Sequence, residues 1–323
     1  MKKDIVVGID LGGTHVRAGA FDAAGDLLAM RETPTEAQRG AQAGLQRIEQ
    51  LVEQVWRESG AESLAGIGIG CTGPVDVGLG VINNPYTLPG WENVPIVSRL
   101  QERFGVPVTL ENDADVAALG EYWRGAGQSI RRLYAVTVGT GVGTALILDG
   151  EIYRGLNNAH PDGGHIVIDP VGPPCYCGAN GCWESLCAGP AIARMAQQAD
   201  LSGSILLAMA DGVPERIDAR LVAEAARRGD LLASAVIRRA AYYFSLGIVN
   251  VITLFVPEMI VLSGGVMRSA DLFLPVLREV IARHSVMVPA TEVRIEPAQL
   301  GAYAGLYGAA YTIWSKRSPY ESG

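Results

Sequence analysis

The chain has 323 residues, 49% of them hydrophobic, so it can bury a substantial core and is too long for a single small binding module. A formal charge of -8 argues against a surface built to hold nucleic acid, because such surfaces neutralise phosphates with Lys and Arg. The first residues are basic, but Asp10 interrupts the apolar run before it reaches the length of a signal peptide. We therefore expect a cytoplasmic protein that binds neither nucleic acid nor membrane.

The first part of the chain predicts alternating strands and helices. Residues 5–9 form an apolar run of strand length, and residues 16–21 are apolar again after a glycine turn, which predicts a hairpin. Apolar residues at helical spacing predict a helix over 45–56, and the run over 66–70 predicts a buried strand. This alternation is typical of a layered α/β fold.

The later part repeats the first pattern. Residues 133–138 and 145–148 predict two strands around a second glycine loop, and two similar hairpins indicate a duplicated, two-lobe architecture with a cleft between the lobes. Residues 231–255 are strongly apolar but carry Arg238 and Arg239, so they predict a buried helix and not a membrane span. Further elements are a strand over 259–263 and helices over 219–226, 271–284 and 303–314, the last returning to the first lobe.

The two glycine loops suit phosphate chemistry. Asp10 stands at a strand end and is followed by Gly12, Gly13 and Thr14, which offers a carboxylate, backbone amides and a hydroxyl to phosphate and Mg²⁺. Taken alone, this pentapeptide is equally typical of an ordinary glycine hairpin. The second loop, over 139–144, favours the phosphate interpretation, although neither loop has the Walker pattern.

The segment Glu111-Asn112-Asp113 lies between a predicted strand and a predicted helix. Asn112 or Asp113 could be only the helix cap. Alternatively, Asp113 is a catalytic base that accepts the proton of a phosphoryl acceptor hydroxyl, with Asn112 orienting a neighbouring hydroxyl. The two roles are compatible.

A cysteine cluster is the strongest local signal. His165, Cys175, Cys177 and Cys182 supply the complete ligand set of a closed structural zinc site, whereas free buried cysteines or a redox pair are the alternative. A closed site leaves no position for catalysis, so the metal would brace a loop that carries Asp162 and Glu184. Cys71 and Cys187 lie outside the cluster, and we expect them to be small buried residues.

Gly264 and Gly265, after a strand, either admit a nucleoside or form a plain strand-to-helix turn.

Taken together, these motifs resemble the ROK family (repressors, open reading frames, kinases) over essentially the whole chain. The family belongs to the group with the actin, hexokinase and Hsp70 (ribonuclease H-like) ATPase fold, which implies a two-lobe α/β protein with a cleft. The resemblance places residues 1–115 and about 300–323 in a small lobe, and residues 116–299 in a large lobe with the zinc loop and a dimer surface. It also implies a homodimer or a higher homo-oligomer.

The resemblance further implies an ATP-dependent hexose 6-kinase with Mg²⁺ and structural zinc. Asp113 corresponds to the catalytic base. The sugar would be bound by Gly73, Asn84, Asn112, Asp113, Asp162, His165 and Glu184, with Asn84 the weakest candidate. ATP would be bound by Asp10, Gly12, Gly13, Thr14, Gly139, Thr140, Gly141, Gly264 and Gly265.

One departure concerns the sugar. The family pattern has Glu where this chain has Asp162, so the carboxylate is one methylene shorter: either the loop sits closer to the sugar or this contact is lost. Glucose is the leading substrate, with N-acetylmannosamine, mannose, allose and fructose as alternatives, and the donor could differ from ATP. The family also includes sugar-sensing transcriptional regulators, but these carry an N-terminal helix-turn-helix that does not fit before Asp10.

Overall fold

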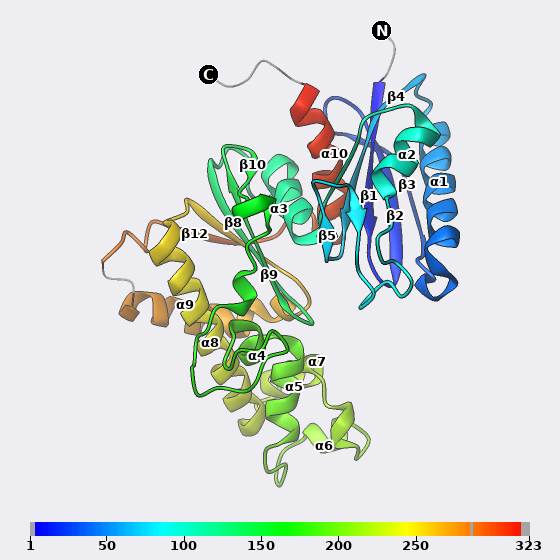
Figure 1. Cartoon of the computed structure of the whole chain (residues 1–323). Coiled ribbons are helices and arrows are strands. Elements are labelled where there is room, and N and C mark those ends of the chain that lie inside the picture. Colours follow the sequence, from blue (N-terminus) through cyan, green and yellow to red (C-terminus); the bar gives the residue numbers. More distant parts are fainter. Residues whose placement is uncertain (1–3, 285–286, 318–323) are drawn as a thin grey trace. The chain divides into compact units, whose positions relative to one another are not determined.

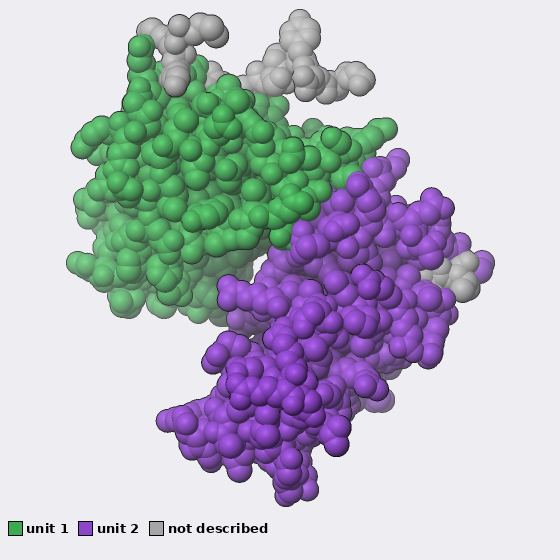
Figure 2. Space-filling view, turned by 180° about the vertical axis from the view of Figure 1, so that it is seen from behind, with its two compact units in different colours: residues 1–131, 145–160, 298–323 green, residues 132–144, 161–297 purple. Residues whose placement is uncertain are grey.

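The computed structural model describes residues 4–284 and 287–317, which form two compact units (Figure 2). Unit 1 comprises Met1–Arg131, Ala145–His160 and Ala298–Gly323, and unit 2 comprises Arg132–Thr144 and Pro161–Pro297. The parts of the expected lobes at residues 1–3, 285–286 and 318–323 lie outside the described residues.

Unit 1 is built on a five-stranded sheet with the order β3-β2-β1-β4-β7 (Figure 1). Strands β1, β2 and β3 pair antiparallel, whereas β4 pairs parallel with both β1 and β7. The predicted glycine hairpin is therefore confirmed. The described helices and strands of unit 1 are β1 (Asp4–Leu11), β2 (His15–Phe21), β3 (Leu27–Pro34), α1 (Gly40–Ser59), β4 (Ser63–Cys71), β5 (Val75–Asp76), β6 (Val81–Ile82), α2 (Ile96–Phe104), β7 (Val108–Asn112), α3 (Asp113–Arg124), β10 (Glu151–Ile152) and α10 (Ala304–Arg317).

Both faces of this sheet are covered, which explains why its strands are continuously apolar. Helices α1 and α10 lie on opposite sides of the sheet (Figure 1). Alternate side chains of β1 point to opposite faces: Ile5, Val7 and Ile9 join the core under α1, while Val6 packs with residues of α10. At Gly68 of β4 an added Cβ would lie 1.7 Å from the backbone oxygen of Ala309, so α10 packs directly on the sheet backbone.

Unit 2 contains most of a second five-stranded sheet, with the order β10-β9-β8-β11-β12. The chain crosses from unit 2 to unit 1 within β9 (Val142–Leu148). The other described elements of unit 2 are β8 (Arg132–Val138), α4 (Trp183–Cys187), α5 (Gly189–Gln197), α6 (Leu206–Met209), α7 (Ala219–Arg227), α8 (Leu231–Phe255), β11 (Met259–Ser263), α9 (Ala270–His284) and β12 (Arg294–Pro297).

Helix α8 is the centre of the helical part of unit 2. Among the described residues it is the one helix long and apolar enough to cross a membrane, but 61% of its apolar window is buried inside the protein. It packs against α4, α5, α7 and α9. The structure therefore agrees with the predicted buried helix.

The unit boundary differs from the expected one after residue 115. Helix α3 belongs to unit 1 because it packs along α10, and an added Cβ at Gly308 would lie 1.6 Å from the backbone oxygen of Val116. The segment Ala145–His160 also belongs to unit 1, because Arg154 and His160 contact the first turn of α3 through Asp115. Helix α10 also belongs to unit 1.

Candidate active site

The first glycine turn joins β1 to β2 and places Asp10 at the end of β1. The Gly12 N–H donates to the His15 carbonyl oxygen (3.0 Å), and the Thr35 hydroxyl donates to the Gly12 carbonyl oxygen (2.6 Å). Arg17 Nη1 lies 3.2 Å from Asp10 Oδ2 and also binds Glu32 through Nε. Burial raises the pKa of Asp10, while the guanidinium opposes this shift.

Gly13 and Thr14 complete this turn. An added Cβ at Gly13 would lie 2.9 Å from the Thr87 carbonyl oxygen, so the position needs glycine for space. The Thr14 carbonyl oxygen accepts from the Thr35 N–H at 2.8 Å. The turn is thus a fixed loop with a carboxylate at one end, as the phosphate interpretation requires.

Asn112 and Asp113 lie where β7 passes into α3. Asn112 is the N-cap, and its Oδ1 accepts from the Ala114 N–H at 2.8 Å. Asp113 Oδ1 accepts from the same N–H at 2.9 Å. The capping interpretation is therefore correct for Asn112, and it leaves the role of Asp113 open.

The Asp113 side chain is accessible to solvent, yet its surroundings disfavour the ionised carboxylate. Solvent still reaches the residue, yet desolvation by the surrounding protein raises its pKa to about 6. The Ala114 N–H opposes this shift, and the Asp10 carboxylate adds to it. A carboxylate that is reachable and titrates near neutrality is suited to accept a proton from a bound hydroxyl.

Gly73 lies beside Asn112, whereas Asn84 has a structural role. An added Cβ at Gly73 would lie 3.1 Å from Asn112 Nδ2. Asn84 is fully buried; its Nδ2 donates to the Thr72 carbonyl and the Thr87 hydroxyl, and its Oδ1 accepts from the backbone of Tyr86 and Thr87. All four hydrogen-bonding positions of the amide are used within the protein, which favours a structural role for Asn84.

The second glycine loop joins β8 to β9 in unit 2. The Gly139 N–H donates to the Gly141 carbonyl oxygen (2.9 Å), and Thr140 is exposed at the tip. Glu184, from α4, accepts the Val142 N–H at 2.9 Å, and an added Cβ at Gly141 would lie 2.2 Å from its Oε2. Glu184 is therefore held directly against this loop.

The other glycine pair lies at the same sheet edge. Strands β8 and β11 are parallel neighbours, with Thr137 opposite Ser263, so the loops at their carboxyl ends are adjacent. Gly264 has φ 92°, and an added Cβ would lie 2.4 Å from the Val138 carbonyl oxygen. At Gly265 an added Cβ would meet nothing within 4 Å. Ligands of α/β sheets bind at such carboxyl edges.

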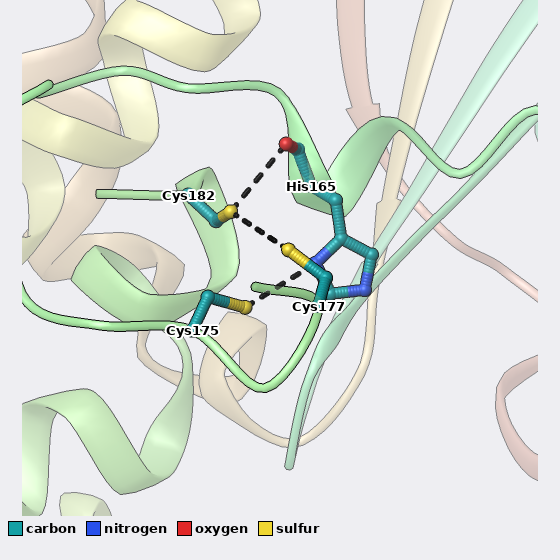
Figure 3. A group of neighbouring side chains, drawn as sticks. All are labelled: His165, Cys175, Cys177 and Cys182. Carbon is teal, nitrogen blue, oxygen red and sulfur yellow. Dashed lines mark hydrogen bonds between the residues drawn. The ribbon is translucent and has the colours of Figure 1, made fainter. Parts of the chain in front are cut away.

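The predicted metal ligands come together in unit 2 (Figure 3). The ligand atoms of His165, Cys175, Cys177 and Cys182 all lie within 4.8 Å of one another. His165 Nδ1 lies 3.4 Å from Cys175 Sγ, and the sulfurs of Cys177 and Cys182 are 3.5 Å apart. Tetrahedral zinc with Zn–S bonds of about 2.3 Å separates its sulfurs by about 3.8 Å.

The residues present therefore fit zinc. All five cysteines are free, and Cys71 and Cys187 are buried as expected. A hydrogen bond from the Ala179 backbone lowers the pKa of Cys177, which favours a thiolate, while desolvation raises the pKa of Cys182 to about 12. A cation among these sulfurs would supply the charge that a set of thiolates needs.

The comparisons with known proteins agree with this geometry. Residues 6–316 match the sequence model of the ROK family. The chain belongs to the ROK family. It is 31% identical over 315 residues to a glucokinase of Thermotoga maritima, covering 97% of this chain and 98% of that one.

Two solved structures are similar along nearly the whole chain. One is a ROK hexokinase from Thermus thermophilus, with a TM-score of 0.82, 33% identity and coverage of 97% of this chain and 99% of the other. The second is a ROK glucokinase from Streptomyces griseus in complex with glucose and AMPPNP, with a TM-score of 0.75, 32% identity and coverage of 95% and 98%. The expected actin/hexokinase-like fold of this ROK protein is thus confirmed.

In this ROK protein the segment that contains the four candidate metal ligands also contains Asp162, an expected sugar ligand, just before His165. His165 Nε2 points away from the cysteines and lies 3.5 Å from Asp162 Oδ2. The loop is fixed behind Asp162, since the Gly163 N–H donates to the Thr144 hydroxyl at 3.0 Å. Asp162 and His165 therefore lie on a loop that β9 supports, while Glu184 stands on α4 and binds the start of β9.

The sequence did not predict one charged cluster of this ROK chain. Arg154 forms ion pairs with Glu111 and Asp115, and His160 Nδ1 lies 3.0 Å from Asp115 Oδ2. Asp115 is 1% exposed and stands two residues after Asp113. The sequence carries no signal for this cluster, because the burial of Asp115, which calls for a partner, is visible only in the fold.

Proposed function

We propose that the protein is an ATP-dependent hexose kinase that transfers the γ-phosphate of ATP to the 6-hydroxyl of glucose. The observation that carries this proposal is the Asp113 carboxylate, which is accessible and has a pKa raised to about 6. The glucokinases among its relatives and the glucose and AMPPNP bound by one of them support the choice of glucose and ATP.

Asp113 accepts the proton of the 6-hydroxyl as that oxygen attacks the γ-phosphate in line. Asn112 orients a neighbouring sugar hydroxyl through Nδ2, because its Oδ1 is used by the helix cap. Gly73, next to Asn112, leaves room for the sugar. Asp162, His165 and Glu184 bind further hydroxyls, with the shorter Asp162 in place of the Glu that the family pattern has. Little covalent chemistry is needed, so positioning supplies most of the acceleration.

The glycine loops bind the donor. Backbone amides of Gly13 and Thr14 and of Thr140 and Gly141 are assigned to the phosphates, and Gly264 and Gly265 to the nucleoside. The amides of Gly12 and Gly139 are used within the two turns, which they help to shape. Mg²⁺, when bound with ATP, neutralises the charge that develops on the phosphates. Asp10 is the carboxylate assigned to the metal, and Arg17 holds it in place.

Zinc, when bound by His165 and the three cysteines, supplies structure and not chemistry, because four protein ligands close its coordination. The ligand nitrogen would be Nδ1, which faces Cys175 and leaves Nε2 toward Asp162. We further propose a cytoplasmic homodimer or higher homo-oligomer, which the family resemblance supports.

The test is ADP release from purified protein with Mg²⁺ and ATP across glucose, mannose, allose, fructose and N-acetylmannosamine, with kcat/KM for each. We expect the highest value for glucose and loss of turnover, with ATP binding retained, in Asp113→Ala. The matched control is Asp211→Ala, an exposed carboxylate far from the assigned residues in sequence. A preference for another sugar would correct the substrate alone. Sugar binding without turnover on any sugar would instead support a regulator.

A further inference from the structure

His160 binds a buried carboxylate that stands close to the proposed base in the chain. His160 Nδ1 lies 3.0 Å from Asp115 Oδ2, and both residues belong to unit 1. The His160 side chain is 24% exposed, whereas that of Asp115 is 1% exposed. A carboxylate only accepts hydrogen bonds, so Nδ1 is the nitrogen of this imidazole that carries a proton and donates. The contact therefore joins a partly exposed ring to a fully buried side chain of α3.

Asp115 is held through one of its two oxygens. Oδ2 accepts hydrogen bonds from both His160 and Arg154 Nη1. Oδ1 is buried and has no hydrogen-bond partner among the described residues. A buried carboxylate is costly unless donors and positive charge compensate it. Asp115 therefore depends on both donors, and the loss of His160 would leave Arg154 as the donor that remains for it in this cluster.

The position of Asp115 affects the backbone around Asp113. Both residues belong to the first turn of α3, which follows the N-cap Asn112. The Ala114 N–H lies between them in the chain and donates to the side chains of both Asn112 and Asp113. The turn that Asp115 holds is thus the turn that orients the base. A misplacement of about 1 Å in a reacting group can cost about 100-fold in rate.

We propose that His160 is a positioning residue for phosphoryl transfer, which holds Asp115 and thereby the first turn of α3, so that Asp113 is aligned with the attacking hydroxyl. The inference rests on the proposed kinase function and adds to it a residue that acts through Asp115 and not on the substrate. Desolvation raises the pKa of Asp113, and the charge of His160 opposes this shift, which agrees with a location of His160 near the base.

The experiment replaces His160 by Asn, Gln and Leu. The amide nitrogen of Asn stands at the position of Nδ1 and can donate to Asp115, whereas that of Gln stands at the position of Nε2 and the Leu side chain donates nothing. We expect kcat for glucose to fall by about 10- to 100-fold in His160→Gln and His160→Leu, with the KM values for glucose and ATP unchanged. His160→Asn should retain most of the kcat. The matched controls are the same substitutions at His284, an exposed residue at the end of α9.

Hydrogen exchange in the first turn of α3 provides a measurement that does not require turnover. Exchange should be faster in His160→Gln and His160→Leu than in the wild type, and unchanged in His160→Asn, because the Asn amide retains the contact with Asp115. Should His160→Leu fail to fold, the comparison of His160→Asn with His160→Gln decides the question.

Three results would overturn the proposal: full kcat in all variants, equal losses in all of them, or a raised KM for glucose with unchanged kcat. The last result would indicate a direct sugar contact of His160 in place of a positioning role. A wild type without turnover on any sugar would contradict the kinase function, and hydrogen exchange alone would then decide whether His160 holds the turn.

Discussion

Asp113 is the residue on which the proposed chemistry depends, and its environment sets a pH range. A base must be ionised before it can accept a proton, and burial makes ionisation of this carboxylate harder than in water. Desolvation by the surrounding protein is the main cause of the raised pKa of Asp113, and the neighbouring Asp10 carboxylate adds to it. The same position brings Asp113 close to the carboxylate assigned to Mg²⁺.

We therefore predict that kcat/KM for glucose falls as the pH is lowered through about 6, since Asp113 with a pKa near this value becomes protonated there. The shift is upward from the usual value of 3.8, so the active form is the one present above the raised pKa. Initial rates at saturating ATP between pH 5 and 8 test this. A profile that stays flat down to pH 5 would exclude Asp113 as the titrating base.

At the scale of single elements, Arg154 links the segment after β10 to the strand and helix that carry Asn112 and Asp113. It is 13% exposed and holds two carboxylates, one on β7 and one on α3. Burial raises the pKa of Glu111, and Arg154 opposes that shift. The pair of contacts fixes the end of β7 relative to the first turn of α3.

Replacement of Arg154 by Met should lower the free energy of unfolding by about 3–5 kcal/mol, because two carboxylates lose their buried partner. Arg216→Met is the control, since Arg216 and Asp211 form an exposed pair that contributes about 0–1 kcal/mol. Urea unfolding measures both. Similar small losses in the two variants would show that the Arg154 cluster is effectively solvated.

A separate prediction concerns the loop that carries the candidate metal ligands His165, Cys175, Cys177 and Cys182. Cys182→Ser should reduce bound zinc and weaken glucose binding, because the loop that holds Asp162 and His165 loses its brace. ATP binding should persist. Cys187→Ala is the control, as this cysteine is buried but lies outside the ligand set. Metal analysis and calorimetry give both readouts, and full glucose affinity in zinc-free Cys182→Ser would refute a bracing role.

Local patterns were predictable from the sequence, whereas distant pairs were not. The first and last residues of α8 and β11 could be predicted, because they depend on residues that are neighbours in the chain. The candidate metal ligands could be predicted for the same reason. The Arg154 cluster joins side chains far apart in the chain, and only the fold brings them together. The hydrogen bonds of Asn84 were not predictable either, because a buried, fully bonded amide and a sugar-binding amide look alike in a sequence.

At the scale of the whole molecule, the order of segments decides what can fold alone. Unit 1 is assembled from three separate stretches, and α10 supplies Leu306, Ala310 and Ile313 to the core beside Val6 and Phe21. The N-terminal stretch contains every strand of the first sheet but none of this helix. Its apolar face is therefore incomplete without residues from the other end of the chain.

We predict that a fragment of residues 1–131 does not unfold cooperatively, because one face of its sheet lacks α10. Circular dichroism during thermal unfolding tests this, with the intact chain as the control. A sharp transition in the fragment would show that the core under α1 suffices.

The late position of α10 also has a consequence during protein synthesis. Ribosomes add about 5–20 residues per second, so β1 to β7 are complete roughly 10–40 s before α10 has been made. For that interval the growing chain presents the sheet face around Val6 and Phe21 without its natural cover. A chaperone that acts on this nascent protein would find its binding surface there, and slower translation would lengthen the exposure.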